Sequence, residues 1–139
     1  MRVVAIISWI MYGIAWMLPA LILKCHGQTL IWPGYECVLQ GLLALLIAQI
    51  EILANPLFIA ASCLLLTPNK KIGAAFAITA LIVATQTFTL FKVDIYLDEG
   101  GVNIAHLNSF GPGFYLWYSA IVLVAVAACV RLWRKSRSI

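Results

Sequence analysis

Four long apolar runs constrain this chain more than any other feature of its sequence. They cover Val3–Leu23, Val38–Leu66, Ile72–Phe91 and Phe114–Trp133. About 20 apolar residues in a helix span the roughly 30 Å hydrocarbon core of a bilayer, so each run is long enough for one crossing. Hydrophobic residues make up 64% of the chain and charged residues 10%, too apolar for a water-soluble domain. We therefore expect one all-α membrane domain over residues 1–139, a bundle of four transmembrane helices.

The basic residues predict how these helices are oriented, because Lys and Arg accumulate on the cytoplasmic side. If both termini are cytoplasmic, only Lys24 and Lys92 lie outside. The basic residues on the inner side are Arg2, Lys70, Lys71, Arg131, Arg134, Lys135 and Arg137. We therefore expect a multi-pass protein with both ends in the cytoplasm and two outer loops, residues 24–37 and 92–113.

The basic C-terminal tail has a simple role in this scheme. Arg131, Arg134, Lys135 and Arg137 are expected to meet anionic lipid of the inner leaflet, where each basic residue contributes about 1 kcal/mol. Because these charges lie at a predicted membrane boundary, we expect no binding of nucleic acid. The expected partners are the lipid bilayer and either another membrane protein or further copies of this chain.

Small and polar residues recur at helical spacing within the apolar runs, a pattern typical of helices that pack closely in lipid. The stripe of the first run is Ala5, Ser8, Tyr12, Ala15 and Pro19. The stripe of the second run is Cys37, Gly41, Ala44, Ala48, Glu51, Asn55 and Ser62. The stripe of the third run is Gly73, Ala77, Ala80, Ala84 and Thr87. We expect the second and third helices to form an antiparallel hairpin.

The second run is longer than one crossing requires, at about 43 Å for a continuous helix. Pro56 predicts a kink within it, because proline cannot donate a backbone hydrogen bond and its ring displaces the carbonyl of Ile52. Tilting of the helix, or an end that projects from the membrane, would also accommodate the length. Asn55 is expected to satisfy backbone groups freed by the kink, with direct binding of a ligand as the alternative.

Glu51 is the ionisable residue deep inside a predicted span. Such residues are costly in lipid, face the protein interior and often mark a transport pathway. An intramembrane polar site is therefore predicted from Glu51, Asn55, Thr87, Gln49 and Gln86. Two interpretations remain: a carboxyl group that responds to protons or cations, and a protonated side chain that only joins helices.

The second outer loop predicts a β-hairpin. Apolar and polar residues alternate on both sides of Glu99-Gly100-Gly101, and Thr29–Trp32 in the first loop offers a further strand. Such an extracytoplasmic cap has exposed edges that could bind a partner by strand addition; the alternative is a passive lid. The predicted partner surface is Tyr96, Asp98, Glu99, Asn103 and His106.

Cys25 and Cys37 flank the first outer loop, so a disulfide between them is possible if that side is oxidising. The Cys and His residues lack the spacing of a metal site, and no nucleotide-binding, metalloprotease or nucleophile motif occurs. We therefore predict no metal, no cofactor and no catalytic residues, and expect the protein not to be an enzyme.

Three segments resemble small, uncharacterised bacterial inner-membrane proteins with four helices. They are Pro33–Gly41, Ala54–Leu57 and Gly111–Trp117. The resemblance implies a bacterial inner membrane and brings no activity with it. Small multidrug transporters are similar only in size and helix number, since their acidic residue lies in the first span, where this chain has none.

Two functions follow from these features. The first is a non-enzymatic membrane protein that acts as a complex subunit or an immunity-type partner, through the outer cap and the helix faces. The second is a small oligomeric transporter or channel, linked to protons or cations through Glu51.

Overall fold

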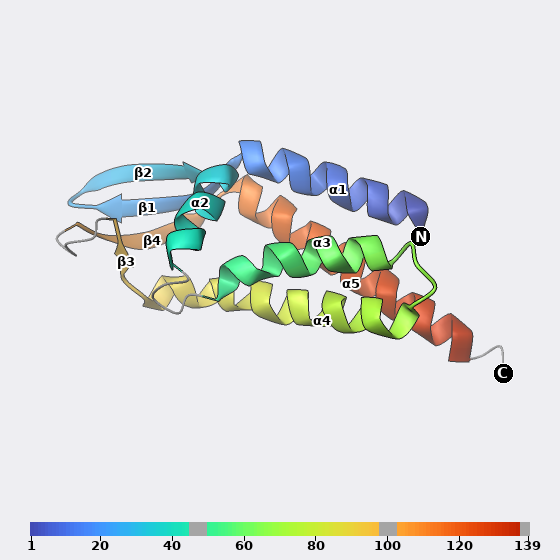
Figure 1. The fold of residues 1–139 in the computed structure, drawn as a ribbon. Helices are drawn as coiled ribbons and strands as arrows, with labels where there is room; N and C mark the ends of the chain where they lie inside the picture. The colour runs from blue at the N-terminus through green and yellow to red at the C-terminus, as the bar shows by residue number, and fades with distance from the viewer. Residues whose placement is uncertain (45–49, 98–102, 137–139) are drawn as a thin grey trace.

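The computed structural model describes residues 1–44, 50–97 and 103–136. Apolar helices form a bundle, and a β-sheet with one short helix beside it lies at one end (Figure 1). The helical elements are α1 (Arg2–Met17), α2 (Gly34–Ala44), η2 (Glu51–Leu53), α3 (Ala54–Leu64), α4 (Lys70–Thr85), η3 (Gln86–Lys92) and α5 (Pro112–Ser136). The strands are β1 (Pro19–Cys25), β2 (Gln28–Pro33), β3 (Ile95–Tyr96) and β4 (Ile104–Phe110).

The prediction of an all-α bundle of four transmembrane helices with a hairpin cap is wrong. A four-stranded antiparallel sheet takes up part of the chain. By length and composition, two helical segments of the described residues could cross a membrane, Lys71–Lys92 and Pro112–Arg134. The apolar helices Arg2–Met17 and Glu51–Leu64 are shorter.

The first apolar run is divided because a proline follows its helix. α1 ends at Met17, and Leu18 is extended, with φ −91° and ψ 152°. A residue before proline is disfavoured in the helical region, and Pro19 itself cannot donate to a helical hydrogen bond. The apolar residues from Pro19 to Leu23, predicted to finish a transmembrane helix, instead begin strand β1.

The second run is divided too, so no single long helix carries Pro56. α2 is described as far as Ala44, Ile50 lies outside a helix, and a 3₁₀ turn at Glu51 leads into α3 at Ala54. Pro56 thereby lies in the first turn of α3, where the backbone N–H groups have no partner within the helix in any case. The predicted kink is therefore replaced by a helix start that accommodates proline.

The sheet has the order β2-β1-β4-β3. The predicted strand at Thr29–Trp32 is present as β2, and the predicted pairing across the second loop is present as β3 with β4. The expected Gly-Gly turn lies outside the described residues. The sheet is larger than expected because β1, assigned to a span in the sequence, pairs with both β2 and β4.

A two-residue turn joins β1 to β2. His26 and Gly27 both have positive φ, 49° and 80°, and Cys25 faces Gln28 as the pair that closes the turn. Positive φ at both central residues is the property of the type I′ turn, whose twist matches that of paired strands. The turn therefore sets the register of the β1–β2 hairpin.

In the bundle, α1 packs on α5, α5 on α4, and α4 on α3. The predicted antiparallel hairpin is confirmed for α3 and α4, and the small-residue stripes are confirmed for α1 and α4. The buried residues of these stripes are Ala5, Ser8, Tyr12 and Ala15 in α1, Gly73, Ala77, Ala80 and Ala84 in α4, and Thr87 in η3. The stripe of the second run is confirmed only at Ser62, because Cys37, Glu51 and Asn55 are partly buried, and Pro19 of the first stripe lies in β1. Close approach of helices over small side chains is the packing that apolar surroundings favour.

Glycines hold the sheet end of the bundle together. The Gly111 N–H donates to the carbonyl of Ala20 at 2.8 Å, and the Gly34 N–H donates to that of Leu18 at 3.1 Å. A Cβ atom at Gly111 would overlap the carbonyl oxygen of Pro19. The starts of α2 and α5 therefore pack directly on the backbone where α1 gives way to β1.

Candidate functional site

A polar contact between three helices lies in the half of the bundle nearer the sheet (Figure 1). Asn55, in the first turn of α3, accepts two hydrogen bonds on its Oδ1 atom. The Tyr12 hydroxyl of α1 donates at 3.0 Å and the Trp117 Nε1–H of α5 donates at 2.9 Å. An amide oxygen has two lone pairs, so this set of donors satisfies it. Asn55 thus joins helices rather than repairing a kinked backbone.

The partners of Asn55 were visible in the sequence only in part. Tyr12 belonged to the predicted buried stripe of the first run, whereas Trp117 was not among the predicted site residues. Both side chains combine an apolar ring with one donor, and buried Tyr and Trp usually find an acceptor. The sequence did show an Asn in one apolar run and Tyr and Trp residues in others. That combination was the available indication of a hydrogen bond between helices.

The other members of the predicted intramembrane site do not gather around Asn55. Among the described residues, no hydrogen bond links Glu51, Thr87 and Gln86 to one another or to Asn55. Gln86 is exposed, and Gln49 lies outside the described residues. The single polar site expected from the sequence is therefore divided into separate groups.

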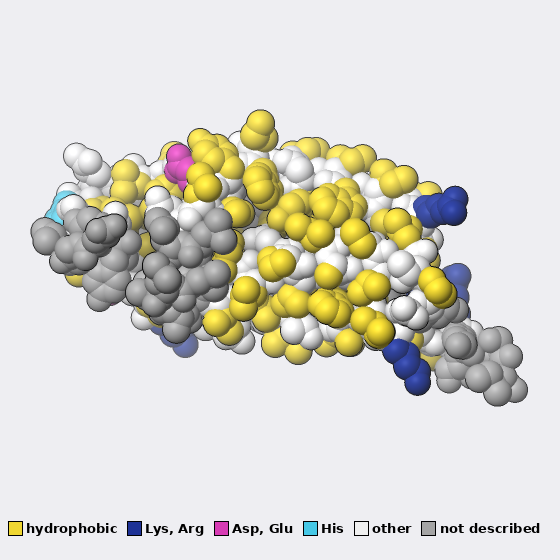
Figure 2. Space-filling model, viewed as in Figure 1, with side chains coloured by type: hydrophobic (Ala, Val, Ile, Leu, Met, Phe, Trp, Pro, Cys, Tyr) yellow, Lys and Arg dark blue, Asp and Glu magenta, His cyan; other side chains and the backbone are white. Residues whose placement is uncertain are grey.

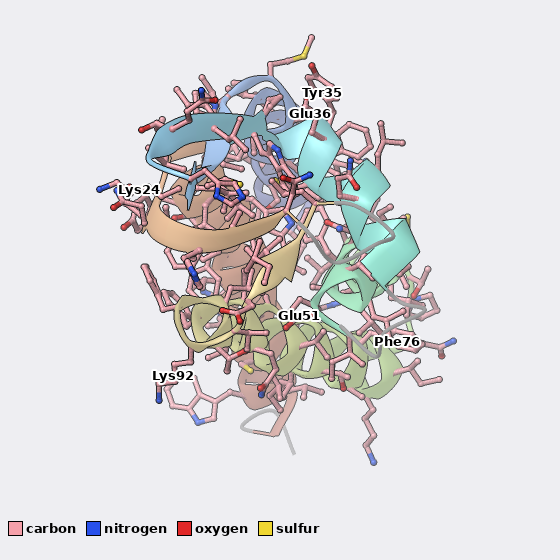
Figure 3. All side chains as sticks on the ribbon, turned by 90° about the vertical axis from the view of Figure 1, so that its left-hand side faces the viewer. Lys24, Tyr35, Glu36, Glu51, Phe76 and Lys92 are labelled. Atoms are coloured by element: carbon pink, nitrogen blue, oxygen red, sulfur yellow. The ribbon has the colours of Figure 1, made fainter. Side chains whose placement is uncertain are left out.

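Glu51 and Thr87 lie near the sheet end of the helices. Glu51 is half-buried in η2, which packs against α4. Figure 3 views the molecule from the sheet end and shows Glu51 within its outline, whereas Lys24 and Lys92 project from the margin. The Oγ1 atom of Thr87 is buried and has no hydrogen-bond partner among the described residues.

Arg131 has a role that the sequence did not predict. Its guanidinium donates to the carbonyl oxygens of Leu64 at 3.3 Å, Leu65 at 2.8 Å and Thr67 at 2.6 Å. Carbonyls at a helix C-terminus lack intrahelical partners and carry partial negative charge, which a cation stabilises. Arg131 of α5 therefore caps α3. Of the other predicted lipid contacts, Arg134 is exposed, and the Lys135 side chain and Arg137 are not described.

Charged side chains divide between the two ends of the molecule. Arg2, Lys71, Arg131 and Arg134 lie where α1 and α4 begin and α5 finishes. In Figure 2, Lys and Arg side chains lie at the ends of this face, and apolar side chains cover the helices between them. The sheet end, by contrast, carries the acidic residues Glu36, Glu51 and Asp94 together with Lys24 and Lys92 (Figure 3). The bundle therefore has a basic end and an apolar middle.

The predicted disulfide is absent, and both thiols are free. Cys25 ends β1 beside the hairpin turn, whereas Cys37 lies against the backbone of Leu21. Leu21 and Cys25 are four positions apart along β1, or about 13 Å. Cys37 therefore lies beside Leu21 rather than at the Cys25 end of β1, and a disulfide requires Cα atoms within about 7 Å of each other. Burial, and to a lesser extent the Glu36 carboxylate, raises the pKa of the Cys37 thiol to about 12.

The cap residues predicted to bind a partner lie along β3 and β4. His106 Nδ1 is 3.0 Å from Asp94 Oδ1, and both side chains are more than half exposed. Asn103 is exposed just before β4, and Tyr96 is in β3, with its side chain not described. Asp98 and Glu99 lie outside the described residues. Of the predicted partner surface, the structure therefore describes His106 and Asn103 as exposed side chains.

The opposite side of the sheet, at β2, was not among the predicted site residues. β2 pairs with β1 only, and it forms the upper edge of the sheet in Figure 1. Ile31 of β2 is 58% exposed. This edge could not be predicted without knowing that Pro19–Cys25 forms a strand. That strand, β1, lies between β2 and β4 and so places β2 at the edge of the sheet.

Comparisons with protein-family models, with curated proteins and with solved structures find no match for this chain. What the protein does is therefore inferred from its own side chains and their contacts.

Proposed function

We propose that the protein is embedded in a bacterial inner membrane and binds a protein partner through its sheet outside the cytoplasm. The membrane placement is supported by the apolar side chains on the outer surfaces of the helices. In α1, the exposed ones include Val3, Ile6, Ile10, Ile14 and Met17. Monomeric water-soluble proteins rarely carry apolar patches of this extent, whereas lipid solvates them well.

The two long helices also favour lipid contact over a soluble core. A core helix of a soluble protein is mostly buried. Here 28% of the apolar window of Lys71–Lys92 and 44% of that of Pro112–Arg134 is buried inside the protein. Most residues of each window are therefore not buried by the rest of the protein. Their apolar side chains are suited to contact with lipid acyl chains.

The proposed orientation follows from the charges. Arg2, Lys71, Arg131 and Arg134 share one end of the bundle, which we assign to the cytoplasmic side because basic residues accumulate there. The sheet at the other end then faces outward. Both chain termini belong to the cytoplasmic side in this arrangement.

The open edge of β2 is the observation that carries the proposed binding function. The pair closing a two-residue hairpin is hydrogen-bonded, and such pairs alternate along an antiparallel ladder. Cys25–Gln28 closes the turn, so Leu30 and Trp32 also bond to β1. Thr29 and Ile31 then direct their N–H and C=O groups away from the sheet.

An edge of this kind is a template for a further strand. Among the described residues, no backbone hydrogen bond outside the β1 ladder is made by Thr29 or Ile31. Ile31 adds an exposed apolar side chain at the edge. We infer that an extended segment of a partner pairs with β2, with backbone hydrogen bonds providing affinity and side chains providing specificity.

Cross-linking at the edge tests this function. A photo-reactive residue at Thr29 is expected to capture a partner in membranes, whereas one at Asn108, an exposed residue of the inner strand β4, is not. Ile31→Pro removes an outward N–H without breaking the β1 ladder and should abolish capture; Ile31→Thr should preserve it. A dimer as the product would identify the partner as a second copy. Equal capture from Asn108, or capture unaffected by Ile31→Pro, would contradict edge binding.

A second function is favoured by the buried, unpartnered hydroxyl of Thr87. Buried polar atoms without partners need an explanation, and a transported ion or water near Glu51 would supply one. In this alternative the protein is a small oligomeric transporter or channel. Proton or cation flux into liposomes that is abolished by Glu51→Gln, but not by the control Glu36→Gln, would support it. Absence of flux in the parent protein would reject it.

A further inference from the structure

A groove runs between α1 and α3 at the basic end of the bundle. These two helices touch little, because α1 packs mainly on α5 and α3 on α4. The groove has a volume of about 260 Å³. Its walls include Ile6 and Trp9 of α1, and Ser62, Cys63 and Leu66 of α3 and the turn after it. The Trp9 and Phe58 rings lie 5.9 Å apart on the side of the groove toward Asn55.

The walls of this groove suit an apolar occupant. Ile6, Trp9 and Leu66 present hydrocarbon surface, and the Ser62 hydroxyl already donates to the carbonyl of Ile59 at 2.9 Å. Few polar groups in the walls are left to orient a polar molecule. A ligand that fills the groove therefore gains mainly by burying apolar surface.

A cationic residue, Arg2, stands at the N-terminal end of the groove. Arg2 contributes to the wall near the N-terminus, and no carboxylate among the described residues pairs with it. Lys71 and Arg131 add positive charge at the same end of the bundle, and Arg131 is engaged with the carbonyls after α3. An anion next to the groove would therefore meet Arg2 as an unpaired guanidinium, which binds phosphate oxygens well.

We propose that the groove binds an anionic phospholipid from the cytoplasmic leaflet, with an acyl chain between α1 and α3 and the phosphate on Arg2. The occupant follows from charge complementarity: the walls require hydrocarbon and Arg2 requires an anion. Free phosphate would leave the walls uncovered, and a neutral lipid would leave Arg2 without a counter-ion. The inference rests on the membrane placement proposed above and is independent of partner binding at β2.

Native mass spectrometry of the protein in mild detergent tests this site. Phosphatidylglycerol should remain bound in preference to phosphatidylcholine with the same acyl chains, and glycerol phosphate should not bind. Arg2→Gln should weaken phosphatidylglycerol binding about fivefold, and Arg2→Lys should largely restore it. Lys71→Gln removes the same charge from the same end, outside the groove, and should change binding less than twofold. Equal effects of Arg2→Gln and Lys71→Gln would overturn the assignment of the head group.

A second pair of variants tests the acyl chain. Cys63 and Cys129 are both exposed. Cys63 is one of the described residues that line the groove, and Cys129 is not. Cys63→Phe should fill the groove and displace the lipid, while Cys129→Phe should leave it bound. Binding unchanged in Cys63→Phe, or binding of glycerol phosphate alone, would overturn the groove as the lipid site.

The experiments can distinguish a failure of the proposed lipid site from a failure of the proposed membrane placement. A parent protein that is monodisperse in buffer without detergent would refute the placement, and the lipid site with it. A protein that needs detergent, but binds both lipids equally, would refute the lipid site alone.

Discussion

Arg131 Nη1 donates to the carbonyl oxygen of Leu65, the residue directly after α3, at 2.8 Å. The contact joins the last turns of α5 to the end of a helix that lies far away in sequence. A carbonyl group just past a helix C-terminus has no partner within the helix, and the guanidinium supplies one. Arg131 therefore stabilises the basic end of the bundle as well as contributing to its charge.

Loss of this cap should destabilise the protein. Arg131→Gln removes hydrogen bonds from a charged donor and is expected to cost about 2 kcal/mol, measured as a lower unfolding midpoint in detergent. Arg134→Gln removes an equal charge one turn later and should change the midpoint little. Equal midpoints for the two variants would show that Arg131 acts only through its charge.

Replacement of Asn55 should leave two donors without an acceptor. Asn55→Leu is expected to destabilise the bundle by about 1–3 kcal/mol, because the Tyr12 hydroxyl and the Trp117 indole N–H become unsatisfied. Tyr12→Phe removes one donor and should cost less. The double variant should cost less than the two single changes combined, since one unsatisfied donor is gone. Additive unfolding free energies would contradict a shared hydrogen-bond network.

Because the backbone at Gly111 packs closely on the α1–β1 junction, adding one methyl group there should clearly lower the stability of the protein. Gly111→Ala forces a Cβ atom onto the carbonyl of Pro19 and should destabilise the protein by about 1–3 kcal/mol. Gly13→Ala is the matched control, because a Cβ atom there meets nothing within 4 Å. Thermal unfolding of the two variants would distinguish a steric effect from a general change of glycine to alanine.

The raised pKa of Cys37 predicts a thiol that reacts slowly at neutral pH. In a variant with Ser at Cys25, Cys63 and Cys129, alkylation should increase only as pH approaches about 12 in the folded protein. The same variant unfolded in a strong detergent should show the inflection near pH 9.0, the ordinary value for the thiol. A folded-state inflection near pH 9.0 would contradict the burial of Cys37.

The same shift links Cys37 to stability. The folded-state pKa is the higher one, so the folded protein keeps the proton while the unfolded chain releases it. The contribution of this thiol to stability is therefore fully present below about pH 9 and is lost as pH rises toward about 12. Cys37→Ala should remove that part of the alkaline destabilisation.

Helix faces were predictable from the sequence, whereas helix ends were not. Small residues repeat every three or four positions in α1 and α4, and that spacing specifies a buried face directly. The strand β1 could not be recognised by periodicity, because Pro19–Leu23 continues an apolar run without a polar interruption. Short apolar runs fit a helix or a buried strand equally, and only the pairing with β2 and β4 decides between them.

The polar contacts were predictable as residues but not as pairs. Asn55 stood out because an amide in an apolar run must find a partner, yet the identity of Tyr12 and Trp117 depends on the order in which the helices pack. Arg131 was interpreted as a lipid contact for the same reason: its distance to α3 is a property of the fold. Long-range neighbours of this kind lie beyond what spacing along one helix can specify.

Labelling from outside the cell tests the central claim, that the apolar bundle lies in a membrane with the sheet outside and the basic end in the cytoplasm. A cysteine-free variant with Thr29→Cys or Arg134→Cys would be treated with an impermeant maleimide in intact bacterial spheroplasts. Labelling is expected at position 29 in intact spheroplasts and at position 134 only after permeabilisation. Labelling of position 134 in intact spheroplasts, or of position 29 only after permeabilisation, would contradict the claim.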